Sequence, residues 1–423
     1  MTLLSEPFRR EYVRRPAPAR LCNVDRLIAV LADRGLDGIV ALTATNQFYL
    51  SSFGRHHSIP EENGLFPVVF SRHHPDHPVL VMPDFDLARL SFQPTWIEDV
   101  RPFRSVLPPG VQPHWDELSR FVPDRALADA GTSLGNGVYY PEMVTAIHAA
   151  MRDLGLDRGV VGFDNLAAGQ AIASAFPNLT AARGDGPLRH TRASKTDVEV
   201  QLLRESTRIN QTALERTVVS WAPGMTYHDL ILSYQVQSML LGGTPNLPDT
   251  FALANSPVPD ATIHAELEVV DFELLPGRSV IFDCHGAYNG YCWDGGKSWI
   301  VGDEPSRELN HAWQAVTDAM HEIHVAARPG ITVNQLTEIG YKTFRQHGVN
   351  DDEVLIFFHG LGLDHLDQDM SITTRDWPIR DNMVISSHIY HPGNENGHLF
   401  LEEIAHVSRH GAERFFSWDM KLF

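Results

Sequence analysis

Residues 279–302 read SVIFDCHGAYNGYCWDGGKSWIVG, with one apolar run before Asn289 and Gly290 and another after them. An Asn-Gly pair between two such runs is typical of a β-hairpin with a tight turn. Asp283 and Asp294 lie eleven residues apart, one on each arm. If the arms pair, the two carboxylates face each other and form a rigid floor for a hard cation. The alternative is a pair of aspartates at loop edges that never meet.

The composition limits the class of protein. A chain of 423 residues can hold two domains with full cores or one large domain. The formal net charge of -19 argues against a nucleic-acid partner. Three cysteines are too few for a disulfide framework, and the chain shows neither a membrane-spanning apolar run nor the apolar core of a signal peptide. We therefore expect a cytoplasmic protein, and its 22 histidines direct attention to metal or proton chemistry.

Helices and strands alternate in the first half of the chain. An amphipathic helix is expected over residues 23–35, followed by a strand in GIVALTA. YLSSFG, residues 49–54, reads as a further strand, and short apolar strands recur in PVVFS, PVLVMP and GVVGFD. This alternation predicts an α/β domain over residues 1–187. The polar segment 183–196 carries turn residues and marks the boundary to a second domain, 188–423.

The second half combines helices with antiparallel strands. A long helix begins at Thr196 and Asp197, with apolar residues at helical spacing. Shorter helices are expected from about 226, over 308–327 and over 332–347. Strands are expected at 250–254, 264–272, 354–360, 383–390 and 398–408. Helices grouped against an antiparallel sheet predict an α+β domain.

Four further residues are candidates for metal chemistry. His359 and His388 each end an apolar strand, His264 follows a proline-rich loop, and strand alternation places Glu402 on the face opposite its neighbours. Each alone is more often a satisfied core or loop residue. Together with the hairpin aspartates, several candidate ligands on the strands of one sheet favour a metal site.

The order of these motifs resembles the M24 "pita-bread" metalloenzymes, which include methionine aminopeptidase, aminopeptidase P, prolidase, creatinase and a dimethylsulfoniopropionate lyase. RLIAVLADRGLDGIVALTATNQFYLSSFG resembles the creatinase-type N-terminal domain, and SKTDVEVQLLRESTRIN resembles the helix that opens the catalytic domain. The resemblance implies an α+β pita-bread catalytic domain preceded by an α/β creatinase-type domain, and a homodimer. It also implies that Asp283, Asp294, His359 and Glu402 are metal ligands, and that His264 binds near the reacting carbonyl.

Residue 388 is the main departure from the family pattern. The peptidases have a glutamate there, in a Glu-Pro pair, which binds metal and serves as general base. Histidine can ligate a metal or accept a proton, but rarely does both. His365 follows His359 by six residues, where peptidases have a histidine seven on and the lyase has a carboxylate base six on. We therefore do not expect routine dipeptidase activity.

The donor set also bears on the metal. Three carboxylates and two imidazoles balance one divalent ion better than two, so we expect one ion among Asp294, His359, His388 and Glu402. Asp283 is then a weaker ligand for a second ion. The mixture of nitrogen and oxygen donors suits zinc, manganese or iron. The alternative is a creatinase-like protein that has lost its metal, with the histidines left for acid–base work.

The function expected first is hydrolysis of a C–N bond (amide, peptide or amidine) in a small carboxylate-bearing substrate. His264 and His365 would stabilise the intermediate and carry protons, and Arg55 and His57 would hold the substrate carboxylate, unless that loop is merely solvated. One alternative is a lyase with His365 as base. Oxygen chemistry on ferrous iron and a binding module without activity are the others.

Overall fold

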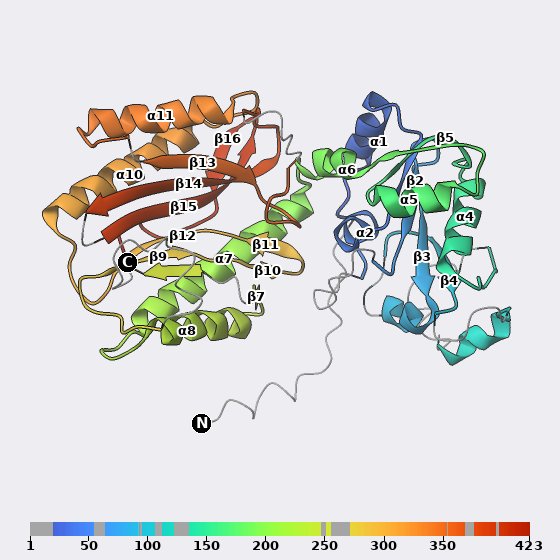
Figure 1. Cartoon of the computed structure of the whole chain (residues 1–423), viewed down its shortest axis with the longest axis horizontal. Coiled ribbons are helices and arrows are strands. Elements are labelled where there is room, and N and C mark those ends of the chain that lie inside the picture. Colours follow the sequence, from blue (N-terminus) through green and yellow to red (C-terminus); the bar gives the residue numbers. More distant parts are fainter. Residues whose placement is uncertain are drawn as a thin grey trace. The chain divides into compact units, whose positions relative to one another are not determined.

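The computed structural model describes most of the chain, namely residues 20–54, 64–91, 93, 95–105, 112–121, 134, 136–246, 251–254, 271–352, 354–368, 376–394 and 397–423. The chain divides into two compact units, Met1–Thr191 and Arg192–Phe423 (Figure 1). No helix in the described ranges is both long and apolar enough to cross a membrane.

The first unit is built on a six-stranded mixed sheet in the order β4-β3-β2-β1-β5-β6. Its strands are β1 (Gly38–Ala41), β2 (Val68–Ser71), β3 (Val79–Pro83), β4 (Asp99–Phe103), β5 (Arg158–Phe163) and β6 (Asn178–Arg183). Its helices are α1 (Val24–Asp33), α2 (Ala44–Ser51), α4 (Met143–Asp153), α5 (Leu166–Ala173) and α6 (Asp185–Arg192), with short 3-10 helices at Asp84–Ser91 and Trp115–Arg120. Every residue of β1 and β3 is buried, as expected for strands covered on both faces. The predicted α/β architecture is confirmed.

Two local predictions in this half were wrong or incomplete. YLSSFG does not form a strand, because its first three residues belong to helix α2. The Ser51 hydroxyl donates to the Gln47 carbonyl one turn back (2.6 Å), and Ser52 ends the helix in a left-handed conformation with φ 59°. A buried helix whose polar side chains bond within it lacks the one-sided apolar stripe of an exposed helix, so its pattern can resemble a strand. The polar boundary segment also contains a helix, α6.

The second unit holds an antiparallel sheet in the order β13-β14-β15-β12-β9-β8, with β16 added on β15, and a small sheet β11-β10-β7. Its strands are β7 (Thr244–Pro245), β8 (Phe251–Ala254), β9 (Ser279–Asp283), β10 (Gly286–Tyr288), β11 (Tyr291–Trp293), β12 (Gly296–Ile300), β13 (Leu355–Gly360), β14 (Met383–Asn394), β15 (Gly397–Ser408) and β16 (Gly411–Arg414). Its helices are α7 (Asp197–Val219), α8 (Tyr227–Leu240), α10 (Arg307–Ala326) and α11 (Val333–Gln346). The α+β prediction is confirmed, and the strand expected at 264–272 lies almost wholly outside the described residues.

Alternation along β14 and β15 separates a packed face from a polar one. Ile385 and Ile389 of β14 and Leu401 of β15 belong to the core that α10 and α11 cover (Figure 1). The intervening residues His388 and Glu402 point to the other face, since successive side chains of a strand alternate. The helices therefore cover one face, and the polar face is left for a site.

The hairpin forms as predicted, with one interruption on each arm. β10 pairs with β11 so that Tyr288 lies opposite Tyr291, and Asn289 and Gly290 make the turn with φ 46° and 86°. Positive φ at both central residues is the reason for the Asn-Gly preference. Further from the turn, β9 pairs with β12. The interruptions fall directly after Asp283 and at Asp294.

Candidate metal centre

Asp294 lies at the centre of the polar site and its side chain is fully buried. One carboxylate oxygen, Oδ2, lies 3.2 Å from His359 Nε2 and 2.5 Å from His365 Nε2. The other, Oδ1, accepts a hydrogen bond from the Gly295 amide (2.9 Å). Helix α7 supports this corner, because the Asn210 side-chain amide donates to the Asp294 carbonyl (3.2 Å). The interruption of the hairpin is therefore held in place from both sides.

His388 and Glu402 face each other across β14 and β15. They are paired in the register of the two strands, and His388 Nε2 lies 2.9 Å from Glu402 Oε1. The Ser386 hydroxyl also donates to Glu402. The rings of His388 and His359 lie 5.0 Å apart, which joins this pair to Asp294. Four buried residues each offer one potential metal-ligand atom, and these four atoms all lie within 4.8 Å of one another: Asp294, His359, His388 and Glu402.

Asp283 and Asp294 converge on His285, which is not among the predicted site residues. His285 Nε2 lies 3.1 Å from Asp283 Oδ1 and 3.1 Å from Asp294 Oδ1. Asp283 itself is outside the buried group of four. The signal for His285 was present, because a residue two positions after Asp283 on an extended segment points to the same side.

The remaining predicted residues fall in two classes. His365 is beside Asp294 and its side chain is 40% exposed, so it forms the solvent side of the site. His264, Arg55 and His57 lie outside the described residues.

Two buried polar atoms in the site lack a hydrogen-bond partner, namely His388 Nδ1 and Glu402 Oε2. Buried polar atoms without partners are costly unless another group, such as an ion, satisfies them. Metal–ligand bonds of about 2.0–2.2 Å place neighbouring donors roughly 3 to 3.5 Å apart. The 2.9 and 3.2 Å separations at Glu402 and His359 are close to that spacing, so these residues fit a transition-metal ion.

The protonation states agree with this fit. Burial, with the charge of His359, lowers the pKa of His388 to about 3, so its ring is neutral at pH 7 and can donate a lone pair. Burial, with the charges of Asp294 and Asp283, raises the pKa of Glu402 well above its usual range. Burial opposes ionisation of Asp294 too, but the charge and hydrogen bond of His285 hold the pKa of that carboxyl well below its usual range. A cation among these groups would favour the ionised form of Glu402.

A buried ion-pair cluster fixes the loop that carries His365. The Arg192 guanidinium contacts Asp364 (2.6 Å) and Asp367 (2.7 Å), and Lys195 Nζ lies 3.5 Å from Asp367. The Asp367 carboxylate also accepts a hydrogen bond from the Leu363 amide (3.1 Å). The loop between β13 and residue 368 is thus tied at both ends, which holds His365 against Asp294.

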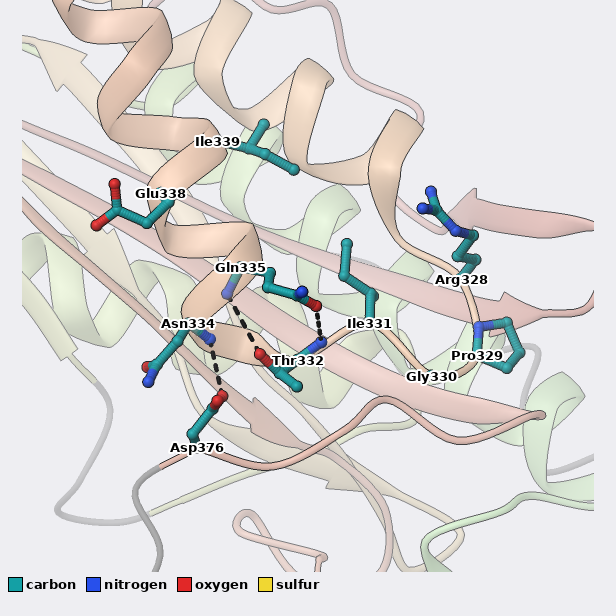
Figure 2. A pocket seen from close by; sticks show the side chains of 10 residues that line it. All are labelled: Arg328, Pro329, Gly330, Ile331, Thr332, Asn334, Gln335, Glu338, Ile339 and Asp376. Carbon is teal, nitrogen blue, oxygen red and sulfur yellow. Dashed lines mark hydrogen bonds between the residues drawn. The ribbon is translucent and has the colours of Figure 1, made fainter.

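An open pocket at the start of α11 is a separate feature (Figure 2). Its polar groups satisfy one another as a helix cap: Thr332 and Gln335 exchange hydrogen bonds, and the Asn334 amide donates to Asp376 (3.1 Å). Such bonds satisfy the free amides of a helix start. We assign this pocket a structural role.

Comparisons with known proteins cover both units. A model of metallopeptidase family M24 matches residues 201–409, and a model of the creatinase/prolidase N-terminal domain matches residues 23–194. The Xaa-Pro dipeptidase of Pyrococcus furiosus is 21% identical over 251 residues, which are 56% of this chain and 67% of that protein. The probable dipeptidase PepE of Mycobacterium bovis is 25% identical over 228 residues, 53% of this chain and 59% of that protein. The matches thus span about two thirds or less of these relatives.

Solved structures match over a greater length. The crystal structure of a dipeptidase from Pyrococcus horikoshii OT3 superposes with a TM-score of 0.66 at 18% identity, covering 94% of this chain and 99% of that one. Likeness at this identity establishes the fold. The expected combination of a creatinase-type N-terminal domain and a pita-bread catalytic domain is confirmed.

Proposed function

Because this chain belongs to metallopeptidase family M24, the pita-bread metalloenzymes, we propose that it is a metal-dependent hydrolase. We propose that it cleaves a C–N bond of an amide, peptide or amidine in a small carboxylate-bearing substrate. The observation that carries the proposal is the buried group of Asp294, His359, His388 and Glu402, with donor atoms within 4.8 Å of one another. A divalent zinc, manganese or iron ion held there supplies Lewis acidity and acidifies water at neutral pH.

His388 is assigned to holding the metal, not to moving protons. Its ring is only 4% exposed, stacks on Phe357 at a centroid distance of 4.0 Å and lies beside Glu402. A general base must reach the proton that it removes, and Phe357 and Glu402 cover the His388 ring against a substrate. The glutamate of the related peptidases both binds metal and serves as general base, whereas the neutral imidazole of His388 is proposed only to bind metal.

His365 is assigned to proton transfer. It is the more exposed histidine of the site, and its Nε2 lies 2.5 Å from Asp294. A neighbouring carboxylate stabilises an imidazolium when the ring takes up a proton, as in other acid–base pairs. The buried ion-pair cluster of Arg192 holds the loop that carries this ring. His264 remains the proposed stabiliser of the intermediate, and it lies outside the described residues.

The substrate is proposed to approach along β13. Leu355, Phe357 and His359 alternate onto the same side of this strand, and the first two are 56% and 47% exposed. Exposed apolar side chains beside a polar centre are typical of substrate-binding walls. An apolar portion of the substrate would lie on Phe357, and Arg55 and His57 are the proposed partners of its carboxylate.

The test is hydrolysis in water labelled with oxygen-18. Protein loaded with zinc, manganese or ferrous iron is incubated with Xaa-Pro dipeptides, N-acyl amino acids and amidino acids. Mass spectrometry then measures the incorporation of oxygen-18 into the products. We expect one solvent oxygen in the product of a cleaved substrate and no turnover after chelation. Product formed without solvent oxygen would indicate elimination and would overturn the proposal.

A matched pair of variants tests the assignment of His365. We expect His365→Asn to lower kcat by about 10²- to 10⁴-fold, the usual contribution of general acid–base catalysis. His410→Asn changes an exposed histidine elsewhere on the unit and is expected to leave kcat unchanged. Equal rates for the two variants would remove His365 from catalysis.

A further inference from the structure

A buried carboxylate next to a proposed metal ligand is held on the opposite face of the sheet. Glu402 points to the polar face of β15, so strand alternation sends Glu403 to the other face. The Glu403 side chain is fully buried, and its carboxylate accepts hydrogen bonds from Trp418 Nε1 (2.7 Å) and from two nitrogens of the Arg414 guanidinium. The backbone that carries Glu402 is therefore fixed from the side that faces away from the site.

An aromatic ring supports the other carboxylate ligand in a similar way. Gly295 directly follows Asp294, and a Cβ added to Gly295 would lie 3.1 Å from the Phe416 ring. The same Cβ would lie 3.0 Å from the Glu402 carbonyl oxygen. The rings of Phe416 and Trp418 are stacked, with centroids 3.9 Å apart and an interplanar angle of 11°. This stacked pair therefore contacts the residue after each of the two carboxylate ligands.

Residues 414–423, which we call the supporting segment, are also tied to β12. The Lys297 side chain of β12 is buried, and its Nζ donates to the carbonyls of Asp419 (3.0 Å) and Lys421 (2.7 Å). The same ammonium lies 4.1 Å from the centroid of the Phe423 ring, within cation–π distance. Strands β12 and β15 are thus joined twice, by their own pairing and by the supporting segment behind them.

We propose that the supporting segment positions Asp294 and Glu402 for the metal ion, with Phe416 and Trp418 as its positioning residues. Asp294 precedes β12 and Glu402 lies on β15, so the separation of the two carboxylates depends on how firmly these strands are joined. Groups that hold metal ligands in place without touching the ion typically contribute about 10- to 100-fold to its affinity. The inference rests on the metal centre of the proposed function and adds to it residues on the far face of the sheet.

The alternative is that the supporting segment only completes the hydrophobic core, and two tryptophans distinguish these roles. Trp418 and Trp313 are each 5% exposed, and each donates one hydrogen bond of 2.7 Å from Nε1. Trp418 donates to Glu403, whereas Trp313 donates to the Met420 carbonyl within the supporting segment. Replacing either tryptophan with phenylalanine makes the same chemical change, but only Trp418→Phe removes a bond to the neighbour of a ligand.

The experiment is a titration of metal-free protein with Co²⁺ in competition with a chelator of known affinity. Visible absorption follows the bound ion, and calorimetry measures the unfolding temperature of the same samples. We expect Trp418→Phe to raise the Kd for Co²⁺ about 10- to 100-fold and to shift the absorption bands. Trp313→Phe should lower the unfolding temperature by a similar amount and leave the Kd and the bands unchanged. Arg414→Lys keeps a positive charge beside Glu403 but loses the paired hydrogen bonds, and it should also raise the Kd.

Two results would overturn the inference: an unchanged Kd in Trp418→Phe, or an equal rise of the Kd in Trp418→Phe and Trp313→Phe. If Trp418→Phe does not fold, the same comparison is made between Arg414→Lys and Trp313→Phe. Either result leaves the metal centre intact, because the wild type still binds the ion. Binding of no ion by the wild type would instead refute the metal centre of the proposed function, and the inference with it.

Discussion

Arg192→Met tests how strongly the buried ion-pair cluster, which contacts the loop that carries His365, stabilises the second unit. The Arg192 side chain is 1% exposed and contacts Asp364 and Asp367, and the Asp367 side chain is fully buried. Burial alone would raise the pKa of Asp367, but the charges of Arg192 and Lys195 lower it to about 2. In the variant, Asp367 keeps only Lys195 at 3.5 Å and the Leu363 amide.

The magnitude follows from burial. Removing one partner of a buried ion pair costs about 3–5 kcal/mol, because the other charge is left without compensation. For a unit the size of Arg192–Phe423, each kcal/mol lowers the unfolding temperature by about 2–4 °C. We therefore expect the transition of this unit to fall by roughly 6–20 °C in differential scanning calorimetry.

Arg208→Met is the matched control for this prediction. Arg208 makes a contact of the same length, 2.6 Å to Glu205, but the two side chains are 52% and 38% exposed. An exposed pair contributes about 0–1 kcal/mol. The two variants thus make the same chemical change and differ in burial. Equal shifts of the unfolding temperature, whatever their size, would show that burial of the ion pair does not determine its contribution to stability.

Three further predictions concern other parts of the second unit. Burial lowers the pKa of Lys297 from 10.5 to about 8. Between these pH values the unfolded chain still holds the proton that the folded protein has lost, so the free energy of unfolding should rise with pH, by up to about 3 kcal/mol. Urea denaturation at pH 7.5, 9 and 10 measures the rise, Lys297→Met should abolish it, and a wild-type curve that falls would contradict it. Phe357→Ala should raise KM about five-fold with little change in unfolding temperature, because about 1 kcal/mol of apolar contact with substrate is lost; an unchanged KM would remove Phe357 from the substrate wall. Gly286→Ala should destabilise by about 1–3 kcal/mol in urea, since the added Cβ would lie 2.0 Å from the Trp293 ring, and full stability would show that this contact relaxes.

Features set by local chemistry could be predicted from the sequence. Asn289 and Gly290 specify a turn that few other pairs allow, and Thr196 caps α7 at the predicted start of the helix, where it forms a capping box with Glu199. The placement of Glu402 on the polar face follows from period-two alternation alone, and its register partner is His388. In each case the residues that decide the structure lie within a few positions of one another or repeat with a fixed period.

Features set by distant partners could not be predicted in this way. Arg192 meets Asp364 and Asp367 across 172 and 175 positions, and nothing in the local sequence marks that pairing. Helix α2 resembled a strand because tertiary packing buries it and removes the one-sided pattern of an exposed helix. His285 is different, because it lies two positions after Asp283, and residues two apart on an extended segment point to the same side.

The most direct test of the metal centre is X-ray absorption spectroscopy of the protein loaded with one equivalent of zinc. We predict a shell of nitrogen and oxygen donors at about 2.0–2.1 Å, with the outer-shell scattering of at least two imidazole rings. His388→Ala should lose one ring from that signal or lose the ion. A shell of oxygen atoms alone, or one with sulfur donors, would show that His359 and His388 do not bind the metal.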